Sequence, residues 1–163
     1  MEVNTKIDDV IKLREEGHNE KAAAILLEFV REYPHNPLVN YRLACVLDYL
    51  GRENEAVDYY ETAIANGLEG EHLQSAFLGL GSTYRCLGLY HKSIEVFNEA
   101  VECFPEDRTL QVFRALTLYN LGRNTEAVSS LLTQLVDTTG DKEIKSYRGA
   151  LRFYADKLDQ VWK

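Results

Sequence analysis

The sequence predicts an all-α chain that is built from repeated helical hairpins. Glycines recur at Gly17, Gly51, Gly88 and Gly122, which stand 34, 37 and 34 residues apart. Each of them follows one apolar helix face and precedes another, and glycine ends helices readily because it tolerates the left-handed conformation. The three prolines of the chain all stand where helices are expected to begin or end, as an all-α chain requires.

The clearest copy of the repeat runs from Phe77 to Asp107. Its first helix carries one apolar face, which Gly88 ends, and a second apolar face leads to Pro105. The first face contains Phe77, Leu80, Gly81 and Tyr84, and the second contains Ile94, Phe97, Ala100 and Val101. A small residue stands five positions after the glycine in every copy, as Ala22, Ala56, Ser93 and Ala127. This position lets the two helices of a hairpin approach closely.

The pattern resembles the tetratricopeptide repeat, whose first helix carries W-x2-L-G-x2-Y, with Phe77 in the Trp position. Ser93 stands where the family usually has Ala. In the fourth copy Gln111 takes the Trp position and Arg114 replaces the usual Leu. The resemblance covers about residues 3–139. It implies a right-handed α-α superhelix of four helical hairpins.

The expected elements follow the repeat in order, within a single domain of residues 1–163. The hairpins are expected at 3–35, 36–69, 71–106 and 107–140. Asn36 is expected to cap the third helix, with Pro37 in its first turn. The irregular junction at 66–70 has two interpretations, a surface insertion or a change of superhelical pitch. The fourth hairpin is expected to bury Ala115, Leu118, Ala127, Val128, Leu131 and Leu135.

One last helix is expected at 141–161, which makes nine helices in all. Its apolar stripe is Ile144, Tyr147, Leu151, Tyr154, Leu158 and Val161. A solitary amphipathic helix of this kind resembles the capping helix that covers the last hairpin of a tetratricopeptide array.

Composition excludes several classes of protein. The net charge is −8 and no block of Lys and Arg occurs, which argues against a nucleic-acid partner. No apolar run is long enough to span a membrane, and the charged N-terminus is unlike a secretory signal. Cys45, Cys86 and Cys103 form an odd set without close spacing, which indicates free thiols in a reducing compartment. We therefore expect a cytoplasmic protein with neither a membrane nor a nucleic acid as partner.

No catalytic constellation emerges from the sequence. His18, His35, His72 and His91 all fall near expected turns or helix starts. Cys86 and His91 lack the further ligands that a zinc site needs, and no glycine-rich phosphate loop occurs. We expect no catalytic residue, no metal and no cofactor, and an enzyme is the weakest hypothesis.

The resemblance implies that the first helix of each hairpin lines a concave groove that binds a peptide or a partner helix. Carried onto this chain, the binding residues are Tyr41, Cys45, Asp48, Tyr49, Leu78, Ser82, Arg85, Val112, Leu116, Tyr119 and Asn120. The first copy adds Ile7, Ile11, Arg14 and Glu15. This set is apolar and aromatic, so a partner is expected to cover it. The alternative is that some of these side chains pack against neighbouring repeats. The Lys, Arg and Asn pattern with which some members hold a C-terminal carboxylate is absent.

Two further functions stay open at this stage. Phe153 and Trp162 exceed what one capping stripe needs, and they are candidate contacts of a homodimer. The alternative is that Trp162 folds back on the last hairpin. The leading hypothesis is a non-catalytic scaffold that binds a protein or peptide. A self-assembling structural module comes next, and a peptide-sensing regulator follows.

Overall fold

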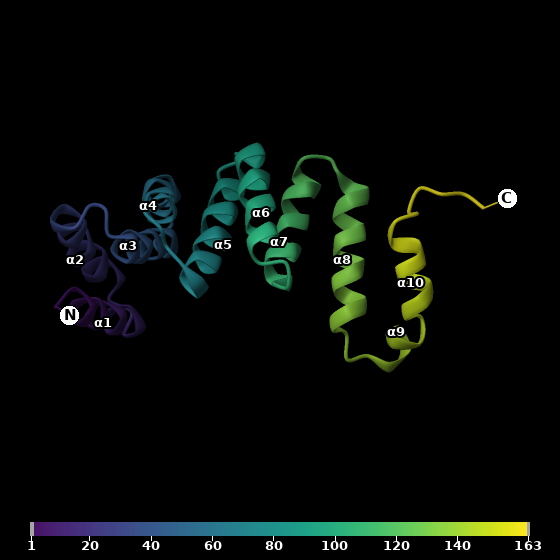
Figure 1. Ribbon diagram of the computed structural model, residues 1–163, viewed down its shortest axis with the longest axis horizontal. Helices are drawn as coiled ribbons and strands as arrows, with labels where there is room; N and C mark the ends of the chain where they lie inside the picture. The colour runs from purple at the N-terminus through teal and green to yellow at the C-terminus, as the bar shows by residue number, and fades with distance from the viewer. Residues whose placement is uncertain (1, 163) are drawn as a thin grey trace. The chain divides into compact units, whose positions relative to one another are not determined.

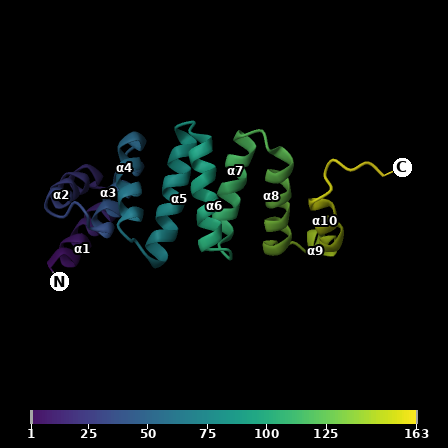
Figure 2. The same ribbon diagram turned by 45° about the horizontal axis from the view of Figure 1, so that its top comes forward.

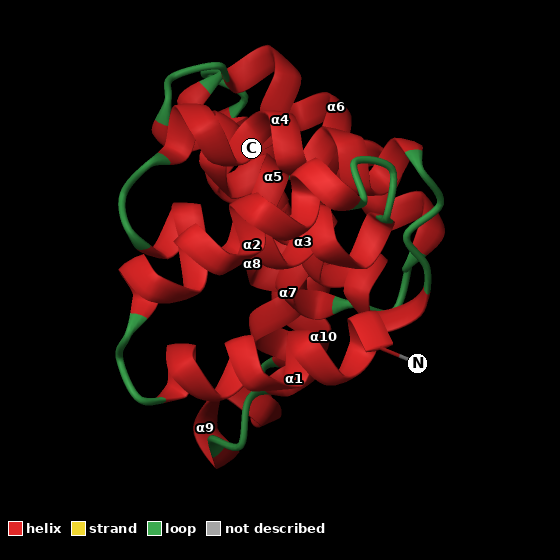
Figure 3. Ribbon diagram, turned by 90° about the vertical axis from the view of Figure 1, so that its left-hand side faces the viewer, coloured by secondary structure: helices red, strands yellow, loops and turns green. Residues whose placement is uncertain are grey.

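The computed structural model describes residues 2–162, with side chains described from Ile7 onward except that of Asp8. Every regular element in this part of the chain is a helix, as Figure 3 shows. There are ten helices over the described range. The prediction of an all-α chain is confirmed.

The chain divides into two compact units between Leu89 and Tyr90. Unit 1 contains the first five helices and unit 2 the other five (Figure 1). The helices of unit 1 are α1 (Glu2–Glu15), α2 (Asn19–Glu32), α3 (Pro37–Tyr49), α4 (Glu53–Ala65) and α5 (Gly70–Cys86). Those of unit 2 are α6 (Tyr90–Cys103), α7 (Arg108–Asn120), α8 (Asn124–Thr138), α9 (Lys142–Ser146) and α10 (Arg148–Ala155). The long helices that follow one another in each unit pack side by side (Figure 2).

The repeated glycines end their helices in one shared geometry. Gly51 has a φ of 71°, and its N–H donates to the Asp48 carbonyl oxygen at 3.0 Å. The next N–H, of Arg52, donates to the Leu47 carbonyl oxygen at 2.9 Å. This pair of bonds is a Schellman motif, which satisfies carbonyl groups that a helix end leaves open. The same two bonds recur around Gly17, Gly88 and Gly122, all with positive φ. The glycines that recur in the sequence therefore mark helix ends of one common type.

The irregular junction lengthens one helix. Gly67 ends α4 with the same pair of bonds, and Leu68 is buried directly after it. Gly70 then begins α5, which has 17 residues against 13 in α3. The extra residues of the middle period thus add about one turn at the start of α5.

The Tyr60 ring of α4 packs directly against the backbone of α5 at Gly79. A Cβ added at Gly79 of α5 would stand 2.5 Å from the ring and hydroxyl of Tyr60 on α4. Tyr60 is buried, so its ring is held where only a glycine leaves room for it. Gly79 thereby lets α5 come close to α4.

The core of unit 2 lies between α6, α7 and α8. Ile94, Ala115, Leu118 and Ala127 form a buried cluster against which Leu121 packs. Beside it, the Ser93 and Thr117 hydroxyls lie 2.9 Å apart and are fully buried. The serine that departs from the family's usual Ala therefore has a hydrogen-bond partner on the facing helix.

The expected face of the fourth hairpin is only partly buried. Ala115, Leu118 and Ala127 lie in the core, but Val128, Leu131 and Leu135 of α8 are exposed. The prediction is wrong for these three residues. They lie on α8 outside the face that packs against α7, and α10 covers α8 only in part.

The prediction of a single C-terminal helix at 141–161 is wrong. The chain forms α9 and α10 instead, with Tyr147 between them, and α10 ends at Ala155. Tyr147 and Val161 are consequently exposed, whereas Leu151 and Ala155 face the protein. Because the break shifts the helical phase, the stripe expected for one straight helix does not form.

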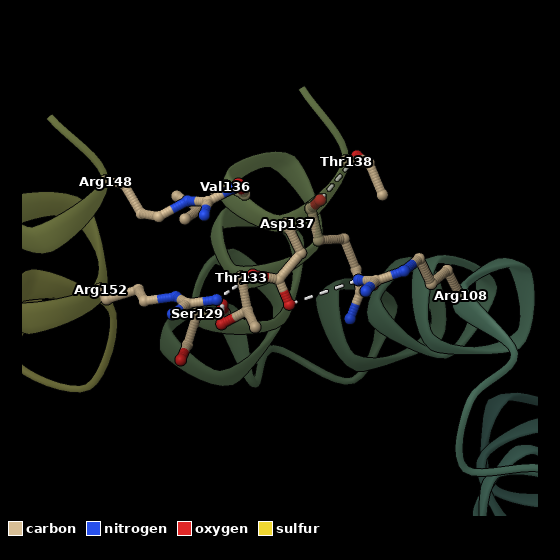
Figure 4. A network of polar contacts seen from close by, with 9 residues as sticks. Arg108, Ser129, Thr133, Val136, Asp137, Thr138, Arg148 and Arg152 are labelled. Atoms are coloured by element: carbon tan, nitrogen blue, oxygen red, sulfur yellow. Dashed lines mark hydrogen bonds and ion pairs between the residues drawn. The ribbon is translucent and has the colours of Figure 1, made fainter. Parts of the chain in front are cut away.

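Asp137, near the end of α8, binds two arginines from two other helices (Figure 4). Arg108 of α7 donates to its Oδ2 at 3.3 Å, and Arg152 of α10 donates to its Oδ1. Arg148 of α10 also donates to the Val136 carbonyl oxygen at 3.3 Å. These contacts attach α10 to the fourth hairpin, so α10 performs the capping that was expected of the single helix.

We predict that Gly79→Ala destabilises the protein by about 1–3 kcal/mol, because the new methyl group overlaps the Tyr60 ring. Urea denaturation followed by circular dichroism measures this change. Gly149→Ala in α10 is the matched control, since nothing lies within 4 Å of the added Cβ. The control is expected to be neutral or stabilising by up to about 1 kcal/mol. Equal effects of the two substitutions would contradict the close approach of α4 and α5.

We predict that the attachment of α10 weakens in acid. The hydrogen bonds from Arg152 and then Arg108 lower the pKa of Asp137. The stabilisation is therefore present above the aspartate value of the unfolded chain, about 3.9, and is lost as pH falls through the lower folded value. Hydrogen exchange of the α10 amides tests this. Asp137→Asn should speed exchange at neutral pH and have a smaller effect near pH 3. The control substitution Asp58→Asn, at an exposed aspartate of unit 1, should leave the exchange of the α10 amides unchanged at both pH values.

Candidate functional site

Most of the predicted binding residues of unit 1 lie on two helices that pack against each other, α3 and α5. We call the surface that they form the α3–α5 face. It contains Tyr41, Cys45, Asp48 and Tyr49 from α3, with Leu78, Ser82 and Arg85 from α5. Tyr49 is its most exposed member at 68 %, and the three α5 residues are half-buried.

Asp48 is held at this face by two hydroxyl groups. Thr83 of α5 donates to its Oδ1 at 3.2 Å, and Tyr60 of α4 donates to its Oδ2 at 3.4 Å. Each carboxylate oxygen has a second lone pair, and Asp48 is only partly buried. The carboxylate therefore has a set orientation and retains capacity to accept a hydrogen bond from a ligand.

Tyr41 belongs to the packing beneath the face. It is 7 % exposed, and its ring lies 5.4 Å from that of His72 and 6.4 Å from that of Tyr60. The Arg42 guanidinium lies 5.4 Å from the Tyr41 ring centroid. Burial raises the pKa of Tyr41 to about 12, so its hydroxyl stays protonated. Tyr41 thus supports the face and offers a ligand little area.

The electrostatics of this face suit binding more than catalysis. Burial raises the pKa of the Cys45 thiol, and the Tyr60 hydroxyl lies 3.7 Å from its sulfur. A thiol with a raised pKa is a poor nucleophile because the thiolate is the reactive form. Burial also raises the pKa of Asp48, although the bonds from Thr83 and Tyr60 oppose that effect.

The predicted residues of unit 2 all lie on α7. Tyr119 and Leu116 are exposed, and Val112 is half-buried. Asn120, at the end of the helix, is half-buried as well. Leu116 and Tyr119 are three residues apart, so they lie side by side on one helix surface.

Helix α1 contributes fewer exposed residues to the candidate binding surface than the sequence predicted. Ile7 is buried and Ile11 is half-buried, whereas Arg14 and Glu15 are exposed. Ile7, Val10 and Ile11 pack near Leu26 of α2 and Val46 of α3. Two of the four candidates in the first copy therefore serve packing.

Sequence reasoning missed the residues that position Asp48. Thr83 directly follows the predicted Ser82, and Tyr60 lies on α4, the second helix of its hairpin, whereas the groove was expected only on first helices. A buried threonine on a face otherwise made of Phe, Leu and Tyr was the available signal, because a buried hydroxyl needs a partner.

No group of three or more His, Cys, Asp and Glu that could hold a metal occurs among the residues that the structure describes. Over the same range, no helix combines the length and the apolar character that crossing a bilayer requires.

Comparison with solved structures finds the same fold in other proteins. YrrB, described as a TPR protein with an unusual peptide-binding site, matches with a TM-score of 0.72 and 20 % identity over 93 % of this chain and 77 % of YrrB. TTC0263 of Thermus thermophilus, a thermophilic TPR protein, matches with a TM-score of 0.64 and 22 % identity over 96 % of this chain and 84 % of TTC0263.

A third match is MamA from Desulfovibrio magneticus RS-1, with a TM-score of 0.72 and 16 % identity over 96 % of this chain and 86 % of the MamA chain. At these identities the likeness shows the fold alone. The ten helices of the described range have a tetratricopeptide-type fold, and the long helices that follow one another within each unit pack together.

No curated protein sequence matches the chain. The family model described as tetratrico peptide repeat matches residues 37–158, which is most of the chain. Proteins of this kind are typically non-catalytic scaffolds, and their fold serves protein–protein interaction. The chain belongs to the tetratricopeptide repeat family.

Proposed function

We propose that the protein is a non-catalytic module that binds a peptide or a partner helix on its α3–α5 face. The observation that carries this proposal is the fixed carboxylate of Asp48 next to exposed Tyr49 on α3, with half-buried Leu78 on the neighbouring helix α5. Apolar side chains supply burial energy, and a positioned acceptor selects the ligand that carries a matching donor.

The charge of unit 1 indicates the character of that ligand. Residues 1–89 contain 15 acidic and eight basic side chains, a net charge of −7. Residues 90–163 contain 11 acidic and ten basic side chains, a net charge of −1. An acidic surface attracts cationic partners and raises their rate of association. The ligand that fits best is a short segment with apolar side chains and at least one Lys or Arg.

The likeness to YrrB, a TPR protein with a peptide-binding site, supports a peptide as the ligand. We propose that the remaining predicted binding residues also contribute to ligand binding, because of where they lie on the helices. Ser82 and Arg85 lie on α5 beside Leu78, and half-buried Cys45 lies on α3 three residues before Asp48. Leu116 and Tyr119 of α7 form a separate apolar surface in unit 2, and we propose that it also contacts a protein partner.

A second function is favoured by one observation in unit 2. The rings of Phe153, Tyr154 and Trp162 contact one another, with centroids 5.4 to 6.1 Å apart, yet they stay 50 %, 46 % and 52 % exposed. Trp162 therefore packs on α10, and a large part of each ring faces solvent. We propose that Phe153 and Trp162 contribute to a contact between two copies of the chain.

The ligand of the α3–α5 face is tested by selecting short random peptides on the whole chain. We expect the selected peptides to combine apolar residues with Lys or Arg. Tyr49→Ala should weaken their binding about tenfold, as loss of an aromatic contact residue does. Asp48→Asn should weaken binding of the basic peptides in particular, because it removes the charge that pairs with them.

Tyr147→Ala is the matched control for Tyr49→Ala, because Tyr147 is nearly as exposed and lies in unit 2. Calorimetry with one selected peptide measures each affinity, and circular dichroism verifies that each variant is folded. Peptides that bind Tyr49→Ala and Leu78→Ala as tightly as the wild type would remove this face from the proposal.

The contact between copies is tested by light scattering after gel filtration over a wide range of concentrations. We expect a mass that rises with concentration toward that of a dimer, and Trp162→Ala should shift this transition to higher concentration. A constant monomer mass in the wild type would refute the contact. An unchanged transition in both Trp162→Ala and Phe153→Ala would place it elsewhere on the protein.

A further inference from the structure

A cavity of about 360 Å³ opens in unit 2, away from the α3–α5 face. It is bounded by α7, by the first two turns of α8 and by the C-terminal end of α10. Its lining consists of Arg114, Thr125, Glu126, Ser129, Ser130, Ala155 and Asp156. Cavities of roughly 300–1,000 Å³ hold small-molecule ligands. This one is at the lower end of that range, and six of its seven lining residues have polar or charged side chains.

Arg114 stands where the repeat pattern has leucine. The equivalent residues of the second and third hairpins, Leu43 and Leu80, are buried in the core. A guanidinium in such a position is costly to desolvate, and the family's leucine would fill the space with apolar atoms. Departures of this kind from the local pattern are expected at functional sites.

The contacts of Arg114 leave its outer nitrogens available. Its Nε donates to Asn98 Oδ1 at 2.7 Å, which orients the guanidinium from α6. Among the residues that the structure describes, its Nη atoms donate no hydrogen bond to protein. A guanidinium edge of this kind matches the two oxygens of a carboxylate. The hydroxyls of Ser129 and Ser130 line the same space.

The carboxylates at the rim restrict which anion fits. Both oxygens of Glu126 accept bonds from Arg123, at 2.7 and 2.6 Å, and Asp156 is paired with Lys157. The hydrogen bonds from these partners lower the pKa of both carboxyls, so both are ionised at neutral pH. Arg123 and Lys157 balance these two charges, but the carboxylate oxygens beside Arg114 repel a dianion such as phosphate at close range and have lone pairs left for an ammonium group. They favour a ligand that carries one carboxylate and one cationic group.

We propose that this cavity binds a free amino acid, with its carboxylate on Arg114 and its ammonium group facing Glu126 and Asp156. The size of the cavity and the hydroxyls of Ser129 and Ser130 suit a small polar molecule. This site is independent of the α3–α5 face, since it lies in another unit and uses no residue of that face.

The test screens the proteinogenic L-amino acids against the whole chain by saturation-transfer NMR, at about 10 mM so that millimolar dissociation constants are detected. At least one amino acid is expected to bind. Its amide, which lacks the carboxylate, and its N-acetyl derivative, which lacks the ammonium group, should each bind at least about tenfold more weakly. Inorganic phosphate should not compete.

Arg114→Leu restores the residue usual at this position and should weaken binding of the same amino acid by about tenfold or more. Arg31→Leu is the matched control, because it removes the same charge from the exposed Arg31–Glu28 pair of unit 1. Arg114→Lys retains the charge without the planar fork and should bind with intermediate affinity. The backbone amide signals of Ser129 and Ser130 in the wild-type protein should shift on titration, which locates the site without any variant.

Several results would overturn the proposal. One is the absence of binding by every amino acid in the screen. Another is binding that Arg114→Leu leaves unchanged, or shifts confined to signals outside the cavity. Competition by phosphate, or equal binding of the N-acetyl derivative, would show that an anion other than an amino acid occupies the site.

Discussion

The structure depends on one constraint, that a pair of helices cannot bury both of its apolar faces without a neighbour. In unit 1 each hairpin has such a neighbour, and Leu43, Leu47 and Phe77 are accordingly buried. In unit 2 the last long helix, α8, is covered by α10. An α-helix rises about 1.5 Å per residue, so the 15 residues of α8 extend about 22 Å and the eight of α10 only about 12 Å. The apolar residues of α8 that remain exposed follow from this difference in length.

Polar groups inside the stack are paired between helices and so favour one arrangement. Asp48 with Thr83, Ser93 with Thr117, and Arg114 with Asn98 each join side chains from different helices. A hydrophobic contact tolerates sliding, but a buried hydrogen bond is lost when one helix shifts past the other. Each pair therefore contributes to the alignment of neighbouring helices in its unit as well as to stability.

Local features of the fold were predictable from the sequence because their causes are local. The Schellman endings need only a glycine after an apolar face, so Gly51 and its equivalents identify the hairpins. Burial of Tyr41 depends on His72 and Tyr60, which come from two other helices. The spacing of apolar residues along one helix gives no information about such contacts. The break at Tyr147 was missed because the residues on both sides of it continue a helical pattern in the sequence.

The candidate surfaces differ in how well their side chains are positioned before a ligand binds. Asp48 is already held by Thr83 and Tyr60, and Gly79 keeps α5 close to the Tyr60 ring. A surface whose groups are positioned before binding loses little conformational entropy when the ligand arrives. Trp162, by contrast, lies in the non-helical segment that follows α10, and immobilising it costs part of the energy that its burial supplies. Selective recognition therefore belongs to the α3–α5 face, while the C-terminal rings suit an interaction that depends on buried area more than on precise geometry.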